Sequence, residues 1–340
     1  MKAVFITKPG GPGVVVVKET PNPVLKDGQA LVRVKAAGLN YADVVIRTGF
    51  YPDAPAFPFI PGYEFSGTVE EVRKTNRIRV GDRVVGVTMF GAQAEFIAVD
   101  EGQLLLIPDK LAYEQAAALP VNYLTAYFAL YKLGHIRSGE KVLIHSAAGG
   151  VGSAATQLAL AEGAEVYGTA SSSEKIDYLK KMGVRYPINY RESDFAKVVN
   201  RATSGKGVNL VLDSVGGSIF RRSLKLLVPG GRIICYGVTD MMSGGRRKIW
   251  RVFIKYLVSP KVKVLDLIQN NRCICGLALN RLINDKESIM PTLARIVEMC
   301  ADGIIRPFIG RCYSYAEASE GHAWLESGRS YGKIILNFNN

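Results

Sequence analysis

The chain has 340 residues, with 43 lysines and arginines against 30 aspartates and glutamates, and 48% of its residues are hydrophobic. At about 150 residues per domain, this length favours two domains that each bury a core. The apolar content excludes a disordered chain, and the aperiodic glycines and prolines exclude collagen. The net charge of +13 suits a phosphate-rich cofactor as well as nucleic acid or acidic lipid.

No uninterrupted apolar stretch reaches the roughly 18 residues of a membrane span, and Lys8 and Pro9 interrupt any signal-peptide core. The five cysteines are odd in number and include no C-x-x-C pair. This pattern signals neither a disulfide framework nor a zinc knot. We therefore expect a cytoplasmic protein whose cysteines are reduced core residues.

The first third of the chain consists of short alternating or β-branched runs separated by turn residues such as Pro9-Gly10-Gly11 and Gly81-Asp82. This spacing predicts an all-β first domain, either a small barrel or a sandwich. The expected strands are residues 3–7, 14–18, 30–36, 67–72, 82–88, 94–99 and 104–107.

From about residue 121 the pattern changes to a helix and then to a regular alternation of strands and helices. This alternation predicts an α/β domain with a doubly wound parallel sheet, which in its six-stranded form binds a dinucleotide. A last strand at 332–336 returns to the first domain, which we expect to be discontinuous (1–123 and 283–340) around a cofactor domain at 124–282. The expected strands of that domain are 141–145, 165–169, 184–189, 208–213, 232–236 and 273–277.

A glycine-rich segment directly follows the strand at 141–145 and opens a helix. It is the G-x-G-x-x-G fingerprint with Ala147 in the first position, followed by Gly149, Gly150, Val151 and Gly152. Glycines let the backbone approach a pyrophosphate, whose charge then meets free N–H groups at the helix start. The alternative is a turn that serves packing alone.

The end of the second strand indicates which dinucleotide binds. NAD-binding folds place an acidic residue there to hold the ribose diol. This chain instead has Ser171, Ser172 and Lys175, which suit a 2′-phosphate and predict NADPH rather than NADH. Alternatively the serines cap the next helix and Lys175 is solvated, and capping is compatible with binding.

These features, in this order, resemble the medium-chain dehydrogenase/reductase superfamily, specifically its zinc-free quinone oxidoreductase branch. The resemblance implies a GroES-like catalytic domain and a Rossmann domain. Within the branch, Asn271-Arg272 and Cys275-Gly276 after a basic insert are most similar to the vesicle amine transport protein homologue subfamily. The further matching motifs are Asn40-Tyr41-Ala42-Asp43 with Arg47, Gly49 and Tyr51, residues 58–67, 124–127, 212–217 and 228–232.

Zinc-dependent relatives carry a cysteine where this chain has Asn40, and a histidine in the segment where it has Gly62-Tyr63-Glu64. The histidines His135, His145 and His322 are scattered singly, so we expect no metal site and a structural role for His145. Without a Lewis acid, the resemblance implies a small-molecule substrate that needs little polarisation, such as a quinone or an activated enone.

The resemblance assigns Asn40, Asp43 and Tyr51 to the substrate site, with the Tyr51 phenol able to orient or protonate an oxygen. Asp43 and Arg47 are four residues apart, so an i,i+4 ion pair is the alternative for them, and packing is the alternative for Tyr51. The alternative for each of the remaining expected cofactor contacts is a role as a strand-end or turn residue only. These residues are Thr125, Tyr190, Ser214, Val215, Tyr236, Gly237 and Val238.

An insert at residues 244–263 places four basic residues on one arc of a helical wheel and apolar residues, among them Trp250, on the opposite arc. Such a helix suits contact with an anionic membrane surface, or it covers the active-site mouth or packs on a neighbouring subunit. The family implies a homodimer joined through the edge strand at 273–277. The rival function is an NADPH-binding protein that acts at membranes with little catalysis; no recognised module supports nucleic-acid binding.

Overall fold

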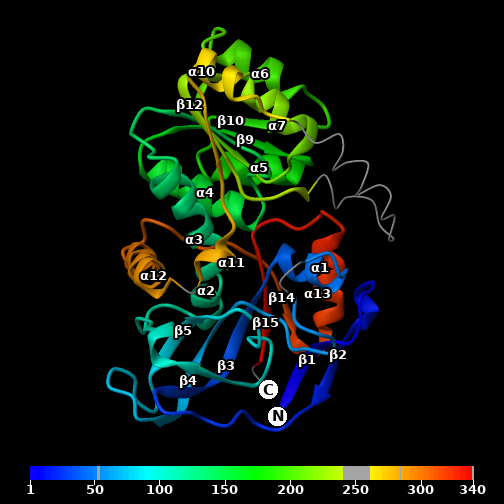
Figure 1. The fold of residues 1–340 in the computed structure, drawn as a ribbon, viewed down its shortest axis with the longest axis vertical. Helices are drawn as coiled ribbons and strands as arrows, with labels where there is room; N and C mark the ends of the chain where they lie inside the picture. The colour runs from blue at the N-terminus through cyan, green and yellow to red at the C-terminus, as the bar shows by residue number, and fades with distance from the viewer. Residues whose placement is uncertain (52–53, 240–260, 284, 339–340) are drawn as a thin grey trace. The chain divides into compact units, whose positions relative to one another are not determined.

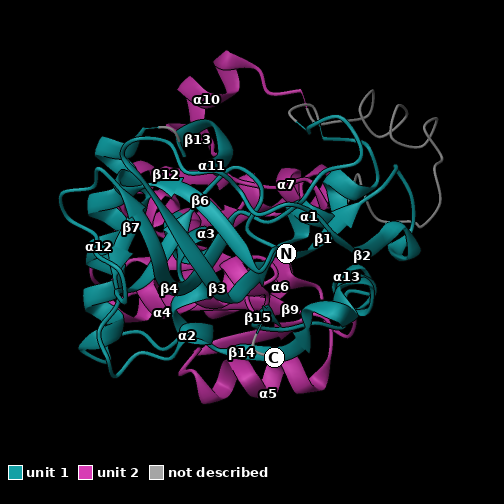
Figure 2. Ribbon diagram, turned by 90° about the horizontal axis from the view of Figure 1, so that it is seen from below, with its two compact units in different colours: residues 1–124, 279–340 teal, residues 125–278 magenta. Residues whose placement is uncertain are grey.

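The computed structural model describes residues 1–51, 54–239, 261–283 and 285–338 (Figure 1). The chain divides into two compact units, Met1–Leu124 with Leu279–Asn340 and Thr125–Ala278 (Figure 2). The insert expected at 244–263 lies outside the described residues except for its last three. None of the described helices has both the length and the apolar composition needed to cross a membrane.

Unit 1 is built on a sheet with the strand order β14-β15-β3-β4-β5-β7, in which β6 also pairs with β3. The C-terminal strand β15 joins this sheet antiparallel to β3, with Ile335 opposite Gly38. The predicted β-rich architecture is confirmed. The strands are β1 (Lys2–Ile6), β2 (Val15–Glu19), β3 (Gln29–Leu39), β4 (Glu64–Arg73), β5 (Arg83–Val87), β6 (Phe96–Asp100), β7 (Leu104–Leu106), β14 (Ile309–Ser314) and β15 (Lys333–Asn337).

The helices of unit 1 lie around this sheet. They are α1 (Tyr41–Arg47), α2 (Tyr113–Ala117), α11 (Leu279–Leu282), α12 (Lys286–Ala301) and α13 (Ala318–Glu326), with the 3-10 turns η1 (Pro12–Val14), η2 (Glu101–Gln103) and η4 (Tyr315–Glu317). Helix α13 contacts both α1 and β15. Residues from the two ends of the chain therefore meet beside α1.

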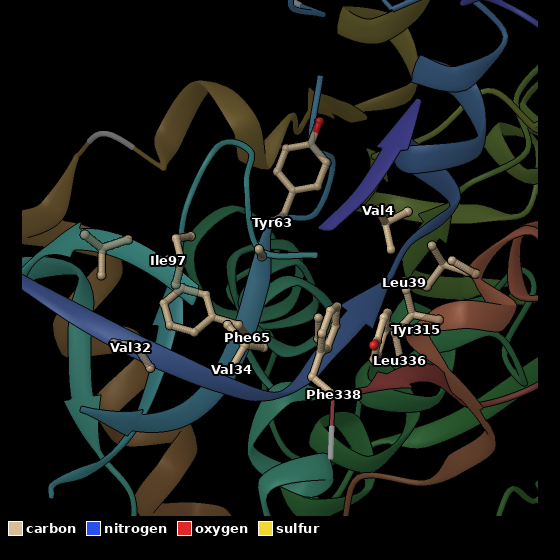
Figure 3. Packing of buried hydrophobic residues seen from close by; sticks show 14 of the residues in the cluster. Val4, Val32, Val34, Leu39, Tyr63, Phe65, Ile97, Tyr315, Leu336 and Phe338 are labelled. Carbon is tan, nitrogen blue, oxygen red and sulfur yellow. The ribbon is translucent and has the colours of Figure 1, made fainter. Parts of the chain in front are cut away.

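Alternating residues of β3 and its neighbours form the core of unit 1 (Figure 3). Val32 and Val34 of β3 are buried together with Phe65 of β4 and Leu336 of β15. Each fully buried side chain of this size contributes about 1.5–3 kcal/mol. This core therefore fixes the ends of β3, β4 and β15, which carry the polar residues described below.

Unit 2 contains a six-stranded parallel sheet in the order β10-β9-β8-β11-β12-β13, which confirms the predicted doubly wound fold. Strand β12 begins five residues before its predicted start because Pro229-Gly230, a turn signal, lies inside an irregular strand. The strands are β8 (Lys141–Ile144), β9 (Glu165–Ala170), β10 (Tyr186–Asn189), β11 (Val208–Asp213), β12 (Leu227–Cys235) and β13 (Cys273–Gly276).

Helices connect the strands of unit 2. Helix α3 (Pro120–Tyr127) carries the chain from unit 1 into unit 2 and continues as a π-helical segment, η3 (Phe128–Leu133). The others are α4 (Gly150–Ala161), α5 (Ser173–Lys181), α6 (Phe195–Ala202), α7 (Gly217–Leu224) and α10 (Val264–Asn270).

The prediction that the cysteines are core residues is wrong. All five are free; Cys273 and Cys312 are exposed, and Cys235, Cys275 and Cys300 are half-buried. For Cys273, Cys275 and Cys312 the physical reason lies in the topology, because β13 and β14 are the end strands of their sheets. An end strand is covered less completely than a central one.

Candidate functional site

The glycine-rich turn lies between β8 and α4. Helix α4 begins after Gly149, and no side chain caps its first turn. The first backbone N–H groups, those of Gly150, Val151 and Gly152, have no acceptor within the helix and favour an anion. A Cβ at Gly152 would lie 2.1 Å from the carbonyl oxygen of Ser146, so the close packing of the turn requires glycine. These features fit the diphosphate of a dinucleotide.

The same turn is tied to the second strand. The N–H of Ala147 donates to the carbonyl of Thr169 on β9 at 2.9 Å, and Ala147 is fully buried. His145 is held in the same region, with Nδ1 3.2 Å from the Thr169 hydroxyl and Nε2 2.7 Å from the Ser223 hydroxyl. Burial, with a smaller effect of the Arg222 charge, lowers the pKa of His145 to about 3. His145 is therefore a neutral structural residue.

The strand order reverses between β8 and β11, the point at which open α/β sheets bind their ligands. There the hydroxyl of Ser214 donates to the hydroxyl of Ser146 at 3.3 Å. The turn after β11 is closed by Asp213, whose Oδ1 accepts the N–H groups of Val215 (2.7 Å) and Gly216 (3.0 Å). The structure thus brings Ser214 and Val215 to the glycine-rich turn.

The segment after β12 joins this group. The N–H of Tyr236 donates to the carbonyl of Asp213 at 3.0 Å, and a Cβ at Gly237 would lie 2.8 Å from the carbonyl oxygen of Ser214. Burial raises the pKa of Tyr236, and a hydrogen bond with Ser214 partly offsets this rise. Val238 is exposed. Residues 236–238 therefore border the same strand ends.

The predicted phosphate-binding residues lie at the end of β9. Ser172 caps α5 by accepting the N–H of Lys175 at 3.5 Å, so the capping role is confirmed. Ser171 and Lys175 are half-buried. Burial lowers the pKa of Lys175, and the charge of Arg191 lowers it further. A second cation, which the sequence reading missed, therefore lies near Lys175.

Two further cofactor candidates are placed differently. Tyr190 follows β10, is 51% exposed, and donates its N–H to the carbonyl of Ala170 at the end of β9 (3.1 Å). It therefore lies beside the segment that carries Ser171 and Ser172. Thr125 is buried in α3, the helix at which the chain enters unit 2.

In unit 1, Asn40 and Asp43 belong to a buried polar network. The Asn40 amide donates to Oε1 of Glu64 at 2.8 Å, and the ammonium of Lys333 donates to Oδ1 of Asn40 at 2.6 Å. Lys333 also pairs with Glu64, whose second oxygen accepts the N–H of Val121 at 2.6 Å. Because all of these side chains are buried, their contacts fix the orientation of the Asn40 amide.

Asp43 is fully buried in the first turn of α1 and accepts the N–H of Asn40 at 2.8 Å. Burial raises the pKa of Asp43 to about 7, against the lowering effects of that hydrogen bond and of the Lys333 charge, while the Glu64 charge raises it further. Burial therefore favours the protonated form of the Asp43 carboxyl.

The alternative ion pair between Asp43 and Arg47 is not the one that forms. Arg47 is fully buried and donates to Glu326 of α13 at 2.6 Å. Burial, followed by the nearby Arg47 charge, lowers the pKa of His322 to about 3. Arg47 therefore joins α1 to α13, and Asp43 belongs to the Asn40 network.

Tyr51 is half-buried and packs against the core of unit 1, so the structure shows the packing contact that was its alternative role.

Within the described residues, no group of three or more histidine, cysteine, aspartate or glutamate side chains is arranged to hold a metal. The side-chain amide of Asn40 is hydrogen-bonded to Glu64 and Lys333. An amide, a carboxylate and an ammonium group are not the nitrogen and sulfur ligands that zinc prefers.

Three residues that were not predicted from the sequence belong to these sites: Glu64, Lys333 and Arg191. Glu64 lies in the matching motif at residues 58–67, and it is the first residue of the buried start of β4. Lys333 is the first residue of an apolar strand, and the sequence around it carries no signal of a functional role. Arg191 follows the third strand of the Rossmann fold, β10, by two residues. A basic residue at this strand end is a sequence signal for binding at the adenosine end of the cofactor.

Two protein families match the chain. The alcohol dehydrogenase GroES-like domain matches residues 26–109, and the zinc-binding dehydrogenase family matches residues 150–295. The first match lies in unit 1, and the second covers most of unit 2. The dehydrogenase architecture is therefore present, although this chain has Asn40 in place of the cysteine of zinc-dependent relatives and Tyr63 in the segment where those relatives carry a histidine.

Individual relatives indicate the branch of the dehydrogenase superfamily to which the chain is most similar. The synaptic vesicle membrane protein VAT-1 homolog of Danio rerio is 38% identical over 98% of this chain and 69% of its own length. The quinone oxidoreductase of Sus scrofa is 31% identical over 99% of this chain and 97% of its own length. The crystal structure of Escherichia coli quinone oxidoreductase complexed with NADPH has a TM-score of 0.87 and 31% identity, covering 99% of this chain and 100% of that chain. The chain belongs to the medium-chain dehydrogenase/reductase superfamily, among the quinone oxidoreductases and VAT-1 homologues.

Proposed function

We propose that the chain is an NADPH-dependent, zinc-independent oxidoreductase that transfers hydride to a quinone or an activated enone. The observation that carries this proposal is the turn at Gly149–Gly152, which opens α4 at the reversal point of the sheet. The similarity to a quinone oxidoreductase solved with NADPH supports the same cofactor here.

The residues of unit 2 suit the successive parts of NADPH. The N–H groups of Gly150, Val151 and Gly152 would hold the diphosphate. Ser171, Ser172 and Lys175, with Arg191, would hold the 2′-phosphate, because hydroxyls and cations replace the acidic residue that NAD-specific folds place there. Tyr190 would lie by the adenosine, and the remaining candidates would border the nicotinamide side: Thr125, Ser214, Val215, Tyr236, Gly237 and Val238. The bound cofactor supplies a hydride.

The residues of unit 1 suit an oxygen-containing acceptor. Lys333 and Glu64 hold the Asn40 amide in one orientation, which leaves its second N–H for a substrate oxygen. Tyr51 would orient that oxygen or donate a proton to it, and Asp43 supplies a proton reservoir near neutral pH. We propose that unit 1 is the catalytic domain and unit 2 the cofactor domain.

We also propose a cytosolic homodimer. The free thiols suit a reducing compartment. Strand β13 is at the end of its sheet, and its outer backbone groups suit pairing with the same strand of a second copy.

One observation favours the rival function at membranes. Helix α10 exposes Val264 (70%), Leu265 (67%) and Ile268 (65%), and Lys261 and Lys263 directly precede it. Exposed apolar residues beside lysines suit an anionic lipid surface.

A paired assay separates the two functions. NADPH oxidation is measured with a panel of quinones and enones, and flotation with anionic liposomes is measured on the same preparation. Turnover with a quinone or an enone supports the oxidoreductase function. Failure of the protein to float with anionic liposomes at low salt contradicts the membrane function. Flotation without turnover on any acceptor would overturn the oxidoreductase proposal.

A further inference from the structure

Two cysteines share one face of strand β13, because residues i and i+2 of a strand point the same way. Cys273 is exposed and Cys275 is half-buried, and their sulfur atoms lie 3.6 Å apart. A strand separates the Cα atoms of such residues by about 6.6 Å. The two side chains therefore converge from their Cα atoms to their sulfur atoms.

The backbone opposes a disulfide between these sulfurs. A Cα separation of about 6.6 Å lies at the upper limit for disulfides, whose sulfurs must approach to about 2.05 Å. Strand β13 is paired along its whole length with β12, from Arg232 opposite Cys273 to Cys235 opposite Gly276. Drawing the two residues together would disturb that pairing, so a ligand that bridges the sulfurs fits better than a bond between them.

A metal ion of the zinc class has the matching dimensions. With Zn–S distances of about 2.3 Å, two corners of a tetrahedron lie about 3.8 Å apart. The observed separation is 3.6 Å. We propose that Cys273 and Cys275 form a dithiolate site for a thiophilic divalent cation such as Zn²⁺ or Cd²⁺.

Binding forms two metal–sulfur bonds and releases the two thiol protons, and no electrons are transferred. Burial, and then the contact with Cys273, raise the pKa of Cys275 to about 11, so the ion must displace a proton at neutral pH. Within the described residues no third ligand joins the pair, so water or a second copy of β13 completes the coordination. The site uses none of the residues assigned to cofactor or substrate.

The test is a titration of the reduced, full-length protein with Cd²⁺, followed by the thiolate-to-cadmium charge-transfer absorbance. We expect a saturable signal at one ion per chain, or one per two chains if copies share it. Cys273→Ser and Cys275→Ser should each weaken binding by at least about tenfold, and raising the pH by one unit should strengthen it by up to about 100-fold.

Cys312→Ser is the matched control, because Cys312 is an exposed cysteine on the end strand β14. It should leave the titration unchanged. Circular dichroism and thermal unfolding without Cd²⁺ confirm that each variant folds. A saturable signal that survives in the C273S/C275S double variant, or the lack of any saturable signal in the folded wild type, would overturn the proposal.

Discussion

The ammonium of Lys333 on the C-terminal strand β15 donates to Oδ1 of Asn40, 293 residues earlier in the chain, at 2.6 Å. The same ammonium pairs with buried Glu64. One cation from the end of the chain thus orients an amide and neutralises a carboxylate at the site we assign to the substrate.

Replacing Lys333 by methionine should lower the free energy of unfolding by about 3–5 kcal/mol, because Glu64 would remain as a buried charge without its cation. Lys286→Met is the matched control: Lys286 pairs with Asp100 on the surface, and losing that pair should cost less than about 1 kcal/mol. Urea denaturation of both variants measures the difference. Equal small losses would show that the Lys333 contacts contribute little.

Asp43→Asn tests the proton held in α1. Burial raises the pKa of Asp43 to about 7, so between about pH 4 and 7 the folded protein holds a proton that the unfolded chain releases. The stability of the wild type should therefore fall as pH rises through this window, by up to about 1.4 kcal/mol per pH unit relative to the asparagine variant. Denaturation at a series of pH values measures this slope, and parallel profiles would contradict the shifted pKa.

Gly152→Ala tests the glycine-rich turn. The added Cβ would lie 2.1 Å from the Ser146 carbonyl oxygen, so the turn must shift and NADPH binding should weaken at least about tenfold. Gly13→Ala is the control, because a Cβ there meets nothing within 4 Å. Fluorescence titration measures both. Unchanged binding by a folded Gly152→Ala variant would mean that the turn serves packing.

Lys175→Ala tests the choice of coenzyme. Loss of a charge-assisted contact with the 2′-phosphate should weaken NADPH binding by about 10- to 100-fold and leave NADH binding unchanged. Lys180→Ala, on the exposed surface of the same helix α5, is the control and should bind both coenzymes normally. A parallel loss of NADPH and NADH affinity would instead indicate damage to α5.

Tyr51→Phe removes only the phenolic hydroxyl, so the packing of the ring against the core of unit 1 is retained. If the hydroxyl donates a proton, kcat should fall by about 100-fold or more while NADPH affinity stays the same. Stopped-flow kinetics with a quinone acceptor measures the rate of the chemical step separately from NADPH binding. An unchanged kcat would leave Tyr51 with its packing role alone.

The fold was predictable because its signals are local. The six strands of unit 2 follow from β-branched runs between helical segments, and the glycine-rich turn follows from its place after β8. The early start of β12 was missed because Pro229-Gly230 imitates a turn, whereas pairing with β11 keeps the segment extended on both sides of an irregularity.

The polar network of unit 1 depended on contacts that spacing does not show. Asp43 and Arg47 are four residues apart, yet Arg47 pairs with Glu326, 279 residues later, because α13 packs against α1. Lys333 gave no signal for a similar reason: its partners meet only when β15 joins β3. Such partners are set by tertiary packing rather than by helix periodicity.

The turn of Gly149–Gly152 should bind a reduced nicotinamide coenzyme. Isothermal titration calorimetry of the folded protein with NADPH and with NADH measures this binding. We predict saturable binding of NADPH, tighter than that of NADH. No saturable heat with either coenzyme would show that the turn does not bind a nicotinamide coenzyme.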